Sequence, residues 1–161
     1  MKSNDKQDAK PLIIGYGNPL RGDDALGHVI VTQLQAELDP TLATFMCCQQ
    51  LTLDLAEDIA QASQVILVDA ALNGEAGALT IRTITPSRTA THTLEHHMTP
   101  AALITAVSVL YDNVPPVTLV SLVGQQWQAG TGLSEMIRNT LPEAIHAIEN
   151  LLDNAKQKDA I

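Results

Sequence analysis

The chain has 161 residues, a length that predicts a single domain. Hydrophobic residues make up 45% of it and aromatic residues only 2%, so the core must be built from aliphatic side chains and methionine. The formal net charge is −9, and all five lysines lie near the two ends, which leaves fifteen acidic residues against four arginines between Pro11 and Ala155. Such a surface repels phosphate backbones and anionic membranes, which argues against nucleic-acid binding.

The sequence shows neither a membrane-span pattern nor a secretory-signal pattern. No apolar run approaches the ~18 residues that a span needs, and residues 1–10 are polar. Cys47 and Cys48 are adjacent, a spacing that suits neither a disulfide framework nor a metal site. We interpret them as small core or near-core residues, pointing to opposite faces of a strand, in a reducing cytoplasm. We therefore expect a cytoplasmic protein with one domain, 11–155, between flexible tails at 1–10 and 156–161.

The first third of the chain alternates strand and helix patterns. Residues 11–17 predict a buried strand that ends at glycines, and a helix is expected from about Asp24. The apolar positions of this helix share one face: Leu26, Val29, Ile30, Leu34 and Leu38. Residues 42–48 predict a second strand, and Thr52 is placed to cap a second helix that runs to about Ala62.

A short connection sets the direction of the fourth strand. The continuous apolar run within 64–69 is typical of a central parallel strand. About eight residues separate it from the next strand pattern at 78–84, whereas a parallel crossover needs about a dozen or more. We therefore expect the fourth strand to run antiparallel to its predecessor.

Two helices and a strand complete the predicted order. Thr99 is a suitable N-cap and is followed by a proline at the first helical position, which predicts a helix over 100–111. Residues 117–123 predict the last strand, and Ser134 opens a final helix in which Pro142 is expected to introduce a kink. Strands alternating with helices indicate a three-layer α/β/α sandwich, with a mostly parallel five-stranded sheet and one antiparallel strand.

In sheets of this kind, ligands bind outside the carboxyl ends of the strands. The loops 18–24 and 69–77 follow the first and third predicted strands, so both should open on that edge. The first loop does not match a nucleotide site, because a dinucleotide fingerprint would have a glycine at Leu20 and a P-loop would need a lysine. Its adjacent carboxylates, Asp23 and Asp24, would also repel a phosphate.

The acidic residues of these loops also have structural interpretations. One of Asp23 and Asp24 suffices to cap the following helix and complement its dipole. Asp69 ends a strongly apolar strand and could start the next turn. The functional interpretation is that Asp69, at the carboxyl end of a central strand, projects a carboxylate into the crevice.

Three of the five histidines lie within residues 92–97. His92, Glu95 and His96 match the inverted zinc-peptidase pattern H-x-x-E-H, which works only on a helix. The Thr99 cap places the helix start after this cluster, so a histidine reaching the crevice from a loop is the favoured interpretation. The remaining two sit in helical patterns and are interpreted as ordinary helix residues: His28 and His146.

Together, Asp24, Asp69 and one of His96 or His97 offer two carboxylates and an imidazole. Three such ligands with open positions suit a borderline divalent ion such as nickel or zinc. Fold logic places at least the two aspartates on the same edge of the sheet.

At these residues the chain resembles the hydrogenase maturation endopeptidases, over residues 12 to about 152. The family pattern G-x-G-N-x-L-x-x-D-[DE]-x-x-G is met by Gly15, Gly17, Asn18, Leu20, Asp23, Asp24 and Gly27. A strand that ends in Asp69 and a histidine shortly before a helix follow in the family order.

The resemblance implies a peptidase that removes a C-terminal extension from the large-subunit precursor of a nickel–iron hydrogenase after nickel insertion. The nickel-contacting and catalytic positions carry over to Asp24, Asp69 and His96, which lies three residues before Thr99 as in the family; His97 is the alternative. The nickel would be supplied by the substrate and not held tightly by the resting enzyme. A polarised water is the expected attacking group.

Two other functions stay open at this stage. One is a non-enzymatic metal- or nucleotide-binding α/β module that uses the same crevice. The other is a self-sufficient zinc peptidase through His92, Glu95 and His96. We expect the crevice rim, at Arg21, Asn73 and 125–131, to contribute selectivity, and we expect a monomer because the low aromatic content suggests no exposed apolar patch.

Overall fold

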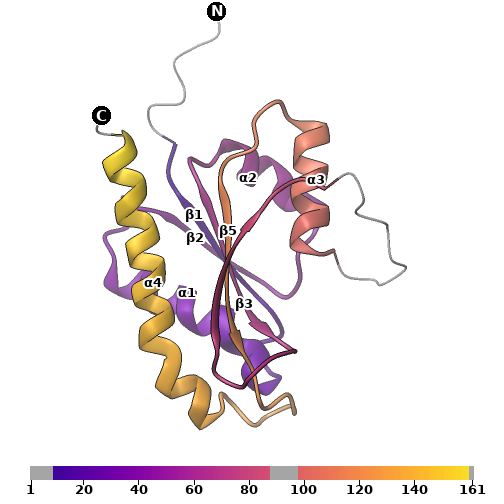
Figure 1. The fold of residues 1–161 in the computed structure, drawn as a ribbon, viewed down its shortest axis with the longest axis vertical. Helices are drawn as coiled ribbons and strands as arrows, with labels where there is room; N and C mark the ends of the chain where they lie inside the picture. The colour runs from indigo at the N-terminus through magenta and orange to yellow at the C-terminus, as the bar shows by residue number, and fades with distance from the viewer. Residues whose placement is uncertain (1–8, 88–97, 160–161) are drawn as a thin grey trace, which may run out of the picture.

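A five-stranded sheet forms the middle layer of the protein, between two layers of helices (Figure 1). The computed structural model describes residues 9–87 and 98–159. The strands are β1 (Leu12–Tyr16), β2 (Thr44–Cys48), β3 (Val65–Ala71), β4 (Leu79–Ile84) and β5 (Val117–Val123). The helices are η1 (Gly22–Ala25), α1 (Leu26–Glu37), η2 (Leu53–Leu55), α2 (Ala56–Gln61), α3 (Pro100–Leu110) and α4 (Glu135–Asp159). The predicted α/β/α sandwich is confirmed.

The strands lie in the order β2-β1-β3-β5-β4, and all are parallel except β4. The expectation that the fourth strand runs against the third is confirmed, but β4 pairs with β5 at the edge of the sheet. The short connection from β3 therefore steps over the position that β5 occupies. Within the described residues, no helix is both long and apolar enough to cross a membrane.

Each face of the sheet buries its own aliphatic cluster. One cluster packs under α1 and α4 and takes alternate strand residues such as Ile13, Val68 and Leu122. The other packs under α2 and α3 and takes the intervening residues, such as Ile14 and Leu67. Because successive strand residues point to opposite faces, this alternation fixes which face each polar residue of the sheet can occupy.

Two glycines allow α1 to lie directly on β1. A Cβ on Gly15 would stand 2.1 Å from the carbonyl oxygen of Gly27, and a Cβ on Gly27 would stand 2.5 Å from the carbonyl oxygen of Val68. Neither position can carry a side chain without moving the helix away from the sheet. These motif glycines therefore serve close helix–strand packing.

Several predicted details differ from the structure. On α1, Val31 is buried and Val29 is only half-buried, because the helix turns Gly27 and Val31 toward Gly15 of β1. Cys47 is exposed and only Cys48 is partly buried, so the interpretation of Cys47 as a core residue is wrong. The final helix continues through Pro142 to Asp159, into the segment expected to be a tail.

The start of α3 follows its predicted capping. The Thr99 hydroxyl accepts a hydrogen bond from the backbone N–H of Ala102 at 3.1 Å, and proline occupies the first turn.

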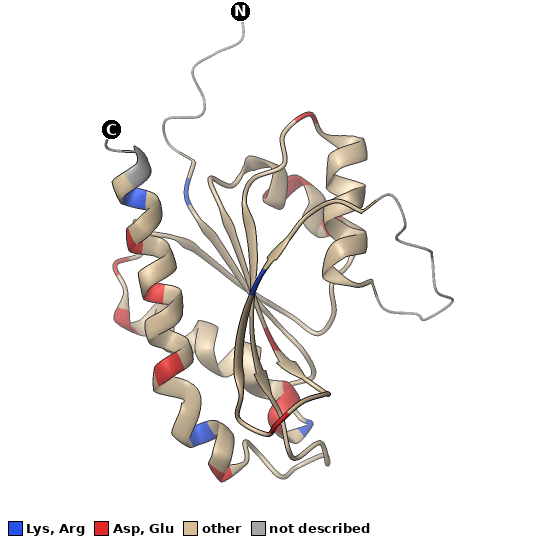
Figure 2. Cartoon of the chain, viewed as in Figure 1, with Lys and Arg blue, Asp and Glu red and all other residues tan. Residues whose placement is uncertain are grey.

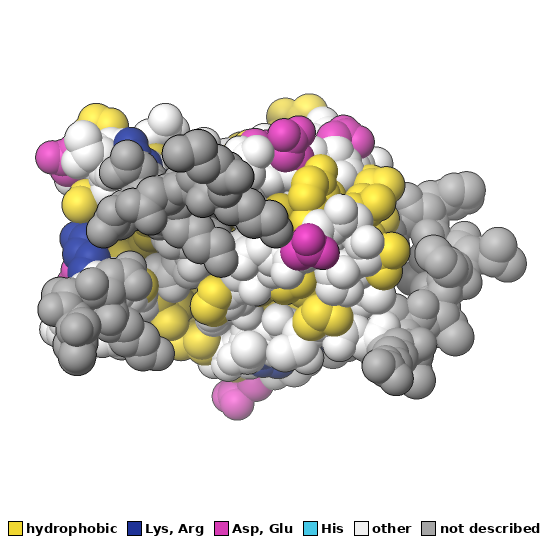
Figure 3. Space-filling model, turned by 90° about the horizontal axis from the view of Figure 1, so that it is seen from above, with side chains coloured by type: hydrophobic (Ala, Val, Ile, Leu, Met, Phe, Trp, Pro, Cys, Tyr) yellow, Lys and Arg dark blue, Asp and Glu magenta, His cyan; other side chains and the backbone are white. Residues whose placement is uncertain are grey.

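At the other end of α3, Val109 is 79% exposed and Leu110 57% exposed, contrary to the expectation of no exposed apolar patch. Figure 3 looks down on this end of the molecule and shows hydrophobic side chains beside acidic ones.

Candidate functional site

The carboxyl ends of β1 and β3 bring Asp24 and Asp69 to one edge of the sheet, as predicted. Asp24 belongs to η1, which follows the β1 loop, and Asp69 lies within β3. The two side chains are close enough that the charge of Asp24 acts on the pKa of Asp69. Acidic positions are also spread over the helices around the sheet (Figure 2). A divalent cation between the two carboxylates would relieve their mutual repulsion.

Local hydrogen bonds fix Asp24 in the β1 loop. The backbone N–H of Asn18 donates to Asp24 Oδ2 at 2.8 Å, and the Asn18 side chain accepts from the N–H of Leu20 at 3.0 Å. Gly17 has a φ of 136°, and a Cβ there would stand 2.1 Å from the Asp24 carbonyl oxygen. Glycine is therefore needed where the loop folds back over Asp24.

The hydrogen bond between Asn18 and Asp24 also explains why the loop after β1 is not suited to bind a phosphate. A phosphate loop aims free backbone N–H groups at the ligand, but here the N–H of Asn18 is already donated to a carboxylate. The anionic side chain of Asp24 occupies the place that an anion would need.

Asp69 is held by a hydroxyl donor on each of its oxygens. Tyr16 donates to Oδ2 at 2.7 Å, and Ser121 donates to Oδ1 at 2.5 Å. Burial raises the pKa of Asp69 above its usual value, against the lowering effect of these two hydrogen bonds and of the charge of Arg82. Burial, with the charge of Asp69, also raises the pKa of Tyr16 far above its usual value, so the phenol stays a donor.

The adjacent Asp23 has a different role. Its carboxylate is fully buried and accepts hydrogen bonds from the backbone N–H groups of Gln125 (2.7 Å), Gln126 (2.9 Å) and Ser134 (2.6 Å). The Ser134 hydroxyl adds a fourth, at 2.9 Å. Burial acts to raise the pKa of Asp23, but the hydrogen bonds outweigh it and lower that pKa. Asp23 therefore ties the loop after β1 to the loop after β5 and to the start of α4, whereas Asp24 makes none of these contacts.

His28 joins the ends of two strands, a role beyond that of an ordinary helix residue. Its Nε2 lies 2.9 Å from the carbonyl oxygen of Gly17 and 3.0 Å from that of Cys48. Both neighbours are carbonyl oxygens, which can only accept hydrogen bonds, so the ring proton of His28 must be on Nε2. His146 lies on the surface beside Glu149, as its helical pattern predicted.

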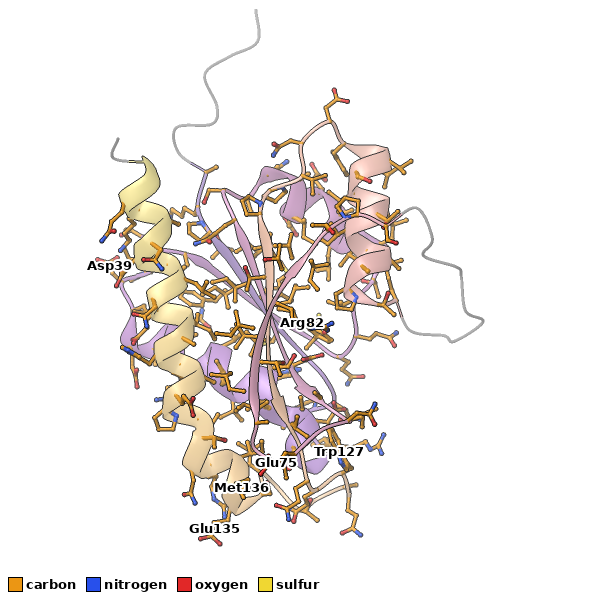
Figure 4. All side chains as sticks on the ribbon, in the orientation of Figure 1. Asp39, Glu75, Arg82, Trp127, Glu135 and Met136 are labelled. Carbon is orange, nitrogen blue, oxygen red and sulfur yellow. The ribbon has the colours of Figure 1, made fainter. Side chains whose placement is uncertain are left out.

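At the rim of the site, two loops that are far apart in sequence contact each other. Arg21 forms a β-bridge with Ala129, and the N–H of Gly130 donates to the carbonyl oxygen of Leu20 at 2.9 Å. The ring of Trp127 packs against Gly124, where a Cβ would stand 2.6 Å from it. Figure 4 shows Trp127 at the same end of the sheet as Glu75. Two of the predicted rim segments, at Arg21 and 125–131, are thus in contact.

The third predicted ligand cannot be placed. His96, its alternative His97, and the zinc-pattern residues His92 and Glu95 lie outside the described residues. In residues 9–87 and 98–159, no three His, Cys, Asp or Glu side chains form a group that could hold a metal. The Cys48 thiol is no ready nucleophile at neutral pH, because burial, with the neighbouring Cys47, raises its pKa.

Sequence analysis missed three residues around the site: Tyr16, Ser121 and His28. His28 is four residues after Asp24, a spacing that places both residues on one side of a helix start, so the sequence could have predicted that His28 lies near the site. Tyr16 and Ser121 meet Asp69 only through strand register, which the sequence does not reveal.

The fold is similar to that of several solved structures. The hydrogenase maturating endopeptidase HybD from E. coli aligns with a TM-score of 0.71 at 20% identity, over 91% of this chain and 93% of that chain. The [NiFe] hydrogenase maturation protease HycI from Thermococcus kodakarensis aligns with a TM-score of 0.72 at 19% identity, over 94% and 99%. A hydrogenase 2 maturation peptidase from a Thaumarchaeota archaeon aligns with a TM-score of 0.67 at 23% identity, over 89% and 98%. No protein-family model and no curated protein matches the sequence.

Proposed function

We propose that this chain is an endopeptidase that removes the C-terminal extension of a nickel–iron hydrogenase large-subunit precursor. The observation that carries the proposal is the pair Asp24 and Asp69, two interacting carboxylates at the carboxyl edge of the sheet. The likeness of the whole fold to proteins named as hydrogenase maturation proteases supports the same conclusion. We further propose that the enzyme works in the cytoplasm as a monomer.

We propose that nickel arrives as part of the substrate and is recognised by Asp24, Asp69 and His96. The two aspartates supply oxygen ligands from rigid elements, and an imidazole would complete a mixed N/O set suited to nickel. Nickel loading then acts as a checkpoint, because a nickel-free precursor offers nothing to offset the repulsion between the two carboxylates. His96 stands three residues before the cap of α3, and His97 is the alternative ligand.

The chemistry assigned to the site is hydrolysis of one peptide bond. Water attacks the scissile carbonyl carbon and gives up a proton to a carboxylate of the site, the C–N bond breaks, and the proton passes to the departing amine. Both carboxylates are half-buried, but their hydrogen bonds differ and suit this exchange: Asp69 accepts from two hydroxyl groups, whereas Asp24 accepts from the backbone N–H of Asn18.

The test is a cleavage assay with nickel-loaded and nickel-free precursor, with mass spectrometry of the products. One C-terminal cut, seen only with nickel, is the expected result. Asp24→Asn and Asp69→Asn should each reduce the rate at least 100-fold, whereas Asp112→Asn, an exposed control, should leave it unchanged. Wild-type rates in both site variants would refute the mechanism.

Further outcomes separate the alternatives. His96→Ala should abolish cleavage and His97→Ala should not; the reverse result would assign His97. Cleavage that is independent of nickel would keep the peptidase and refute the checkpoint. Metal binding without any cleavage would favour a binding module, and about one zinc per purified chain, with loss of activity to chelators, would favour the zinc peptidase.

A further inference from the structure

One row of polar side chains crosses the sheet at the level of Asp69. Strand register pairs Cys48 with Tyr16, Asp69 with Ser121, and Ser121 with Thr80. Gly15 pairs with Val68, so Tyr16 and Asp69 are the next positions on β1 and β3, and their side chains are hydrogen-bonded. We call these five residues the polar row: Cys48, Tyr16, Asp69, Ser121 and Thr80. The residues below it on the same face, such as Ile14, Leu67 and Leu119, are buried and apolar.

We propose that Tyr16 and Ser121 are positioning residues that hold the Asp69 carboxylate in one orientation, aimed at the metal-bearing substrate. The proposal rests on the proposed function for the identity of that substrate. Neither residue is assigned contact with the substrate; both act through Asp69.

The geometry of the two hydrogen bonds carries the argument. A carboxylate has about four lone-pair sites, two on each oxygen. Tyr16 takes one on Oδ2 and Ser121 takes one on Oδ1, so rotation of the carboxylate would break both bonds. Among the described residues, no other hydrogen bond reaches this carboxylate, so one lone-pair site on each oxygen is available to a cation. Outer partners of this kind orient metal ligands and raise their affinity for the metal.

Both donors stand on strands that flank Asp69 directly. Tyr16 ends β1 and Ser121 lies within β5, on opposite sides of β3. Ser121 is only 4% exposed, so water does not compete freely for its hydrogen bond. Because three paired backbones fix the donors and the acceptor, the carboxylate is oriented before any substrate arrives.

The chain offers a matched control for each substitution. Tyr16→Phe and Ser121→Ala each remove one hydroxyl and keep the rest of the side chain. The controls are Tyr111→Phe and Ser108→Ala, which remove the same groups from exposed positions at the end of α3. Ser121→Thr restores a hydroxyl at the same site and should rescue the alanine variant. Thermal unfolding of each variant establishes the folded fraction before any comparison.

Two readouts are measured. The first is the affinity of the chain for Ni²⁺ alone, by calorimetry, with Asp69→Asn as the reference for loss of this site. The second is kcat and KM on nickel-loaded precursor. We expect Tyr16→Phe and Ser121→Ala each to lower nickel affinity and kcat about 10- to 100-fold. KM should change little, because a protein substrate makes most of its contacts outside the carboxylate.

The outcomes distinguish this proposal from the proposed function. If Asp24→Asn and Asp69→Asn lose cleavage but Tyr16→Phe and Ser121→Ala match their controls in both readouts, positioning is refuted and the peptidase stands. If no precursor is cut, the nickel affinities alone decide, and equal affinities of wild type and both variants refute positioning. If the wild type neither cuts precursor nor binds Ni²⁺ at millimolar concentration, both proposals are overturned.

Discussion

Replacement of Asp23 tests whether this residue is structural, as its contacts indicate. In Asp23→Ala, the backbone N–H groups of Gln125, Gln126 and Ser134 lose their acceptor inside the protein. Each buried donor left without a partner destabilises the fold by about 1–3 kcal/mol. Since water can enter the vacated space and accept hydrogen bonds from some of these N–H groups, we expect a loss of about 3–5 kcal/mol in the free energy of unfolding.

Asp23→Asn separates the charge from the shape. The amide keeps one oxygen, which can still accept from Gln125, Gln126 and the Ser134 hydroxyl, all of which bond Oδ2. Its NH₂ group then faces the backbone N–H of Ser134, which bonds Oδ1 in the wild type, so a donor meets a donor. The expected loss is about half that of the alanine variant, roughly 1.5–3 kcal/mol.

The assay is urea or thermal unfolding at pH 7, with Asp112→Ala as the exposed control. For a domain of this size, each kcal/mol shifts the melting temperature by about 2–4 °C, so the alanine variant should melt about 6–20 °C below the wild type. If Asp23→Ala lies within about 0.5 kcal/mol of the control, the buried carboxylate is not the anchor that its contacts indicate.

The lowered pKa of Asp23 adds a pH dependence with a definite sign. A carboxylate whose pKa is lower in the folded than in the unfolded state stabilises the fold above the unfolded pKa, about 3.9, and loses that contribution as the pH falls through the folded pKa. Wild type should therefore lose stability below about pH 4 more steeply than Asp23→Ala does. Parallel acid transitions in the two proteins would contradict this origin.

Three further predictions concern packing, titration and the proline. Gly15→Ala should lower the free energy of unfolding by about 3 kcal/mol or more, because the new Cβ meets the Gly27 carbonyl oxygen. Gly130 is the control: it has a φ of 78° and open space around it, so Gly130→Ala should lose only about 1 kcal/mol in the same unfolding assay. Because the folded-state pKa of Asp69 is raised, wild-type stability should fall as the pH rises from about 4 through that pKa. Asp69→Asn should remove this slope in a series of unfolding curves, and an unchanged slope would contradict the assignment. Pro142→Ala should stabilise α4 by about 1–2 kcal/mol, since a proline inside a helix removes a backbone hydrogen bond; an equal or lower melting temperature would contradict that.

The sequence was sufficient for the layers and most elements because their signals are local. The apolar run around Val68 and the cap formed by Thr99 each report on a few neighbouring residues, and both elements form as expected. The sequence could not predict that β4 pairs with β5, since the short connection after β3 indicates only the direction of β4. The burial of Val31 in place of Val29 was also beyond local signals, because it depends on the contact of Gly27 and Val31 with Gly15 of β1.

At the site, the sequence predicted the edge and its aspartates but not their partners. Asp24 and Asp69 follow from the rule that loops after parallel strands share an edge. Tyr16 and Ser121 do not, because they lie 53 and 52 residues from Asp69 and meet it only once the register is fixed. The placement of His96 stays a prediction.

The adjacent pair Asp23 and Asp24 shows how the surroundings divide one acidic motif into two roles. Four donors occupy Asp23, from residues 102 to 111 positions away, so its lone pairs are engaged and its charge is balanced inside the protein. Within the described residues, Asp24 accepts one hydrogen bond, from Asn18, and keeps lone pairs for a ligand. The two asparagine variants should therefore differ in kind: Asp23→Asn lowers stability, whereas Asp24→Asn leaves stability nearly unchanged and removes cleavage. If both variants fail in the same way, burial and hydrogen-bond occupancy do not assign the roles of these two carboxylates.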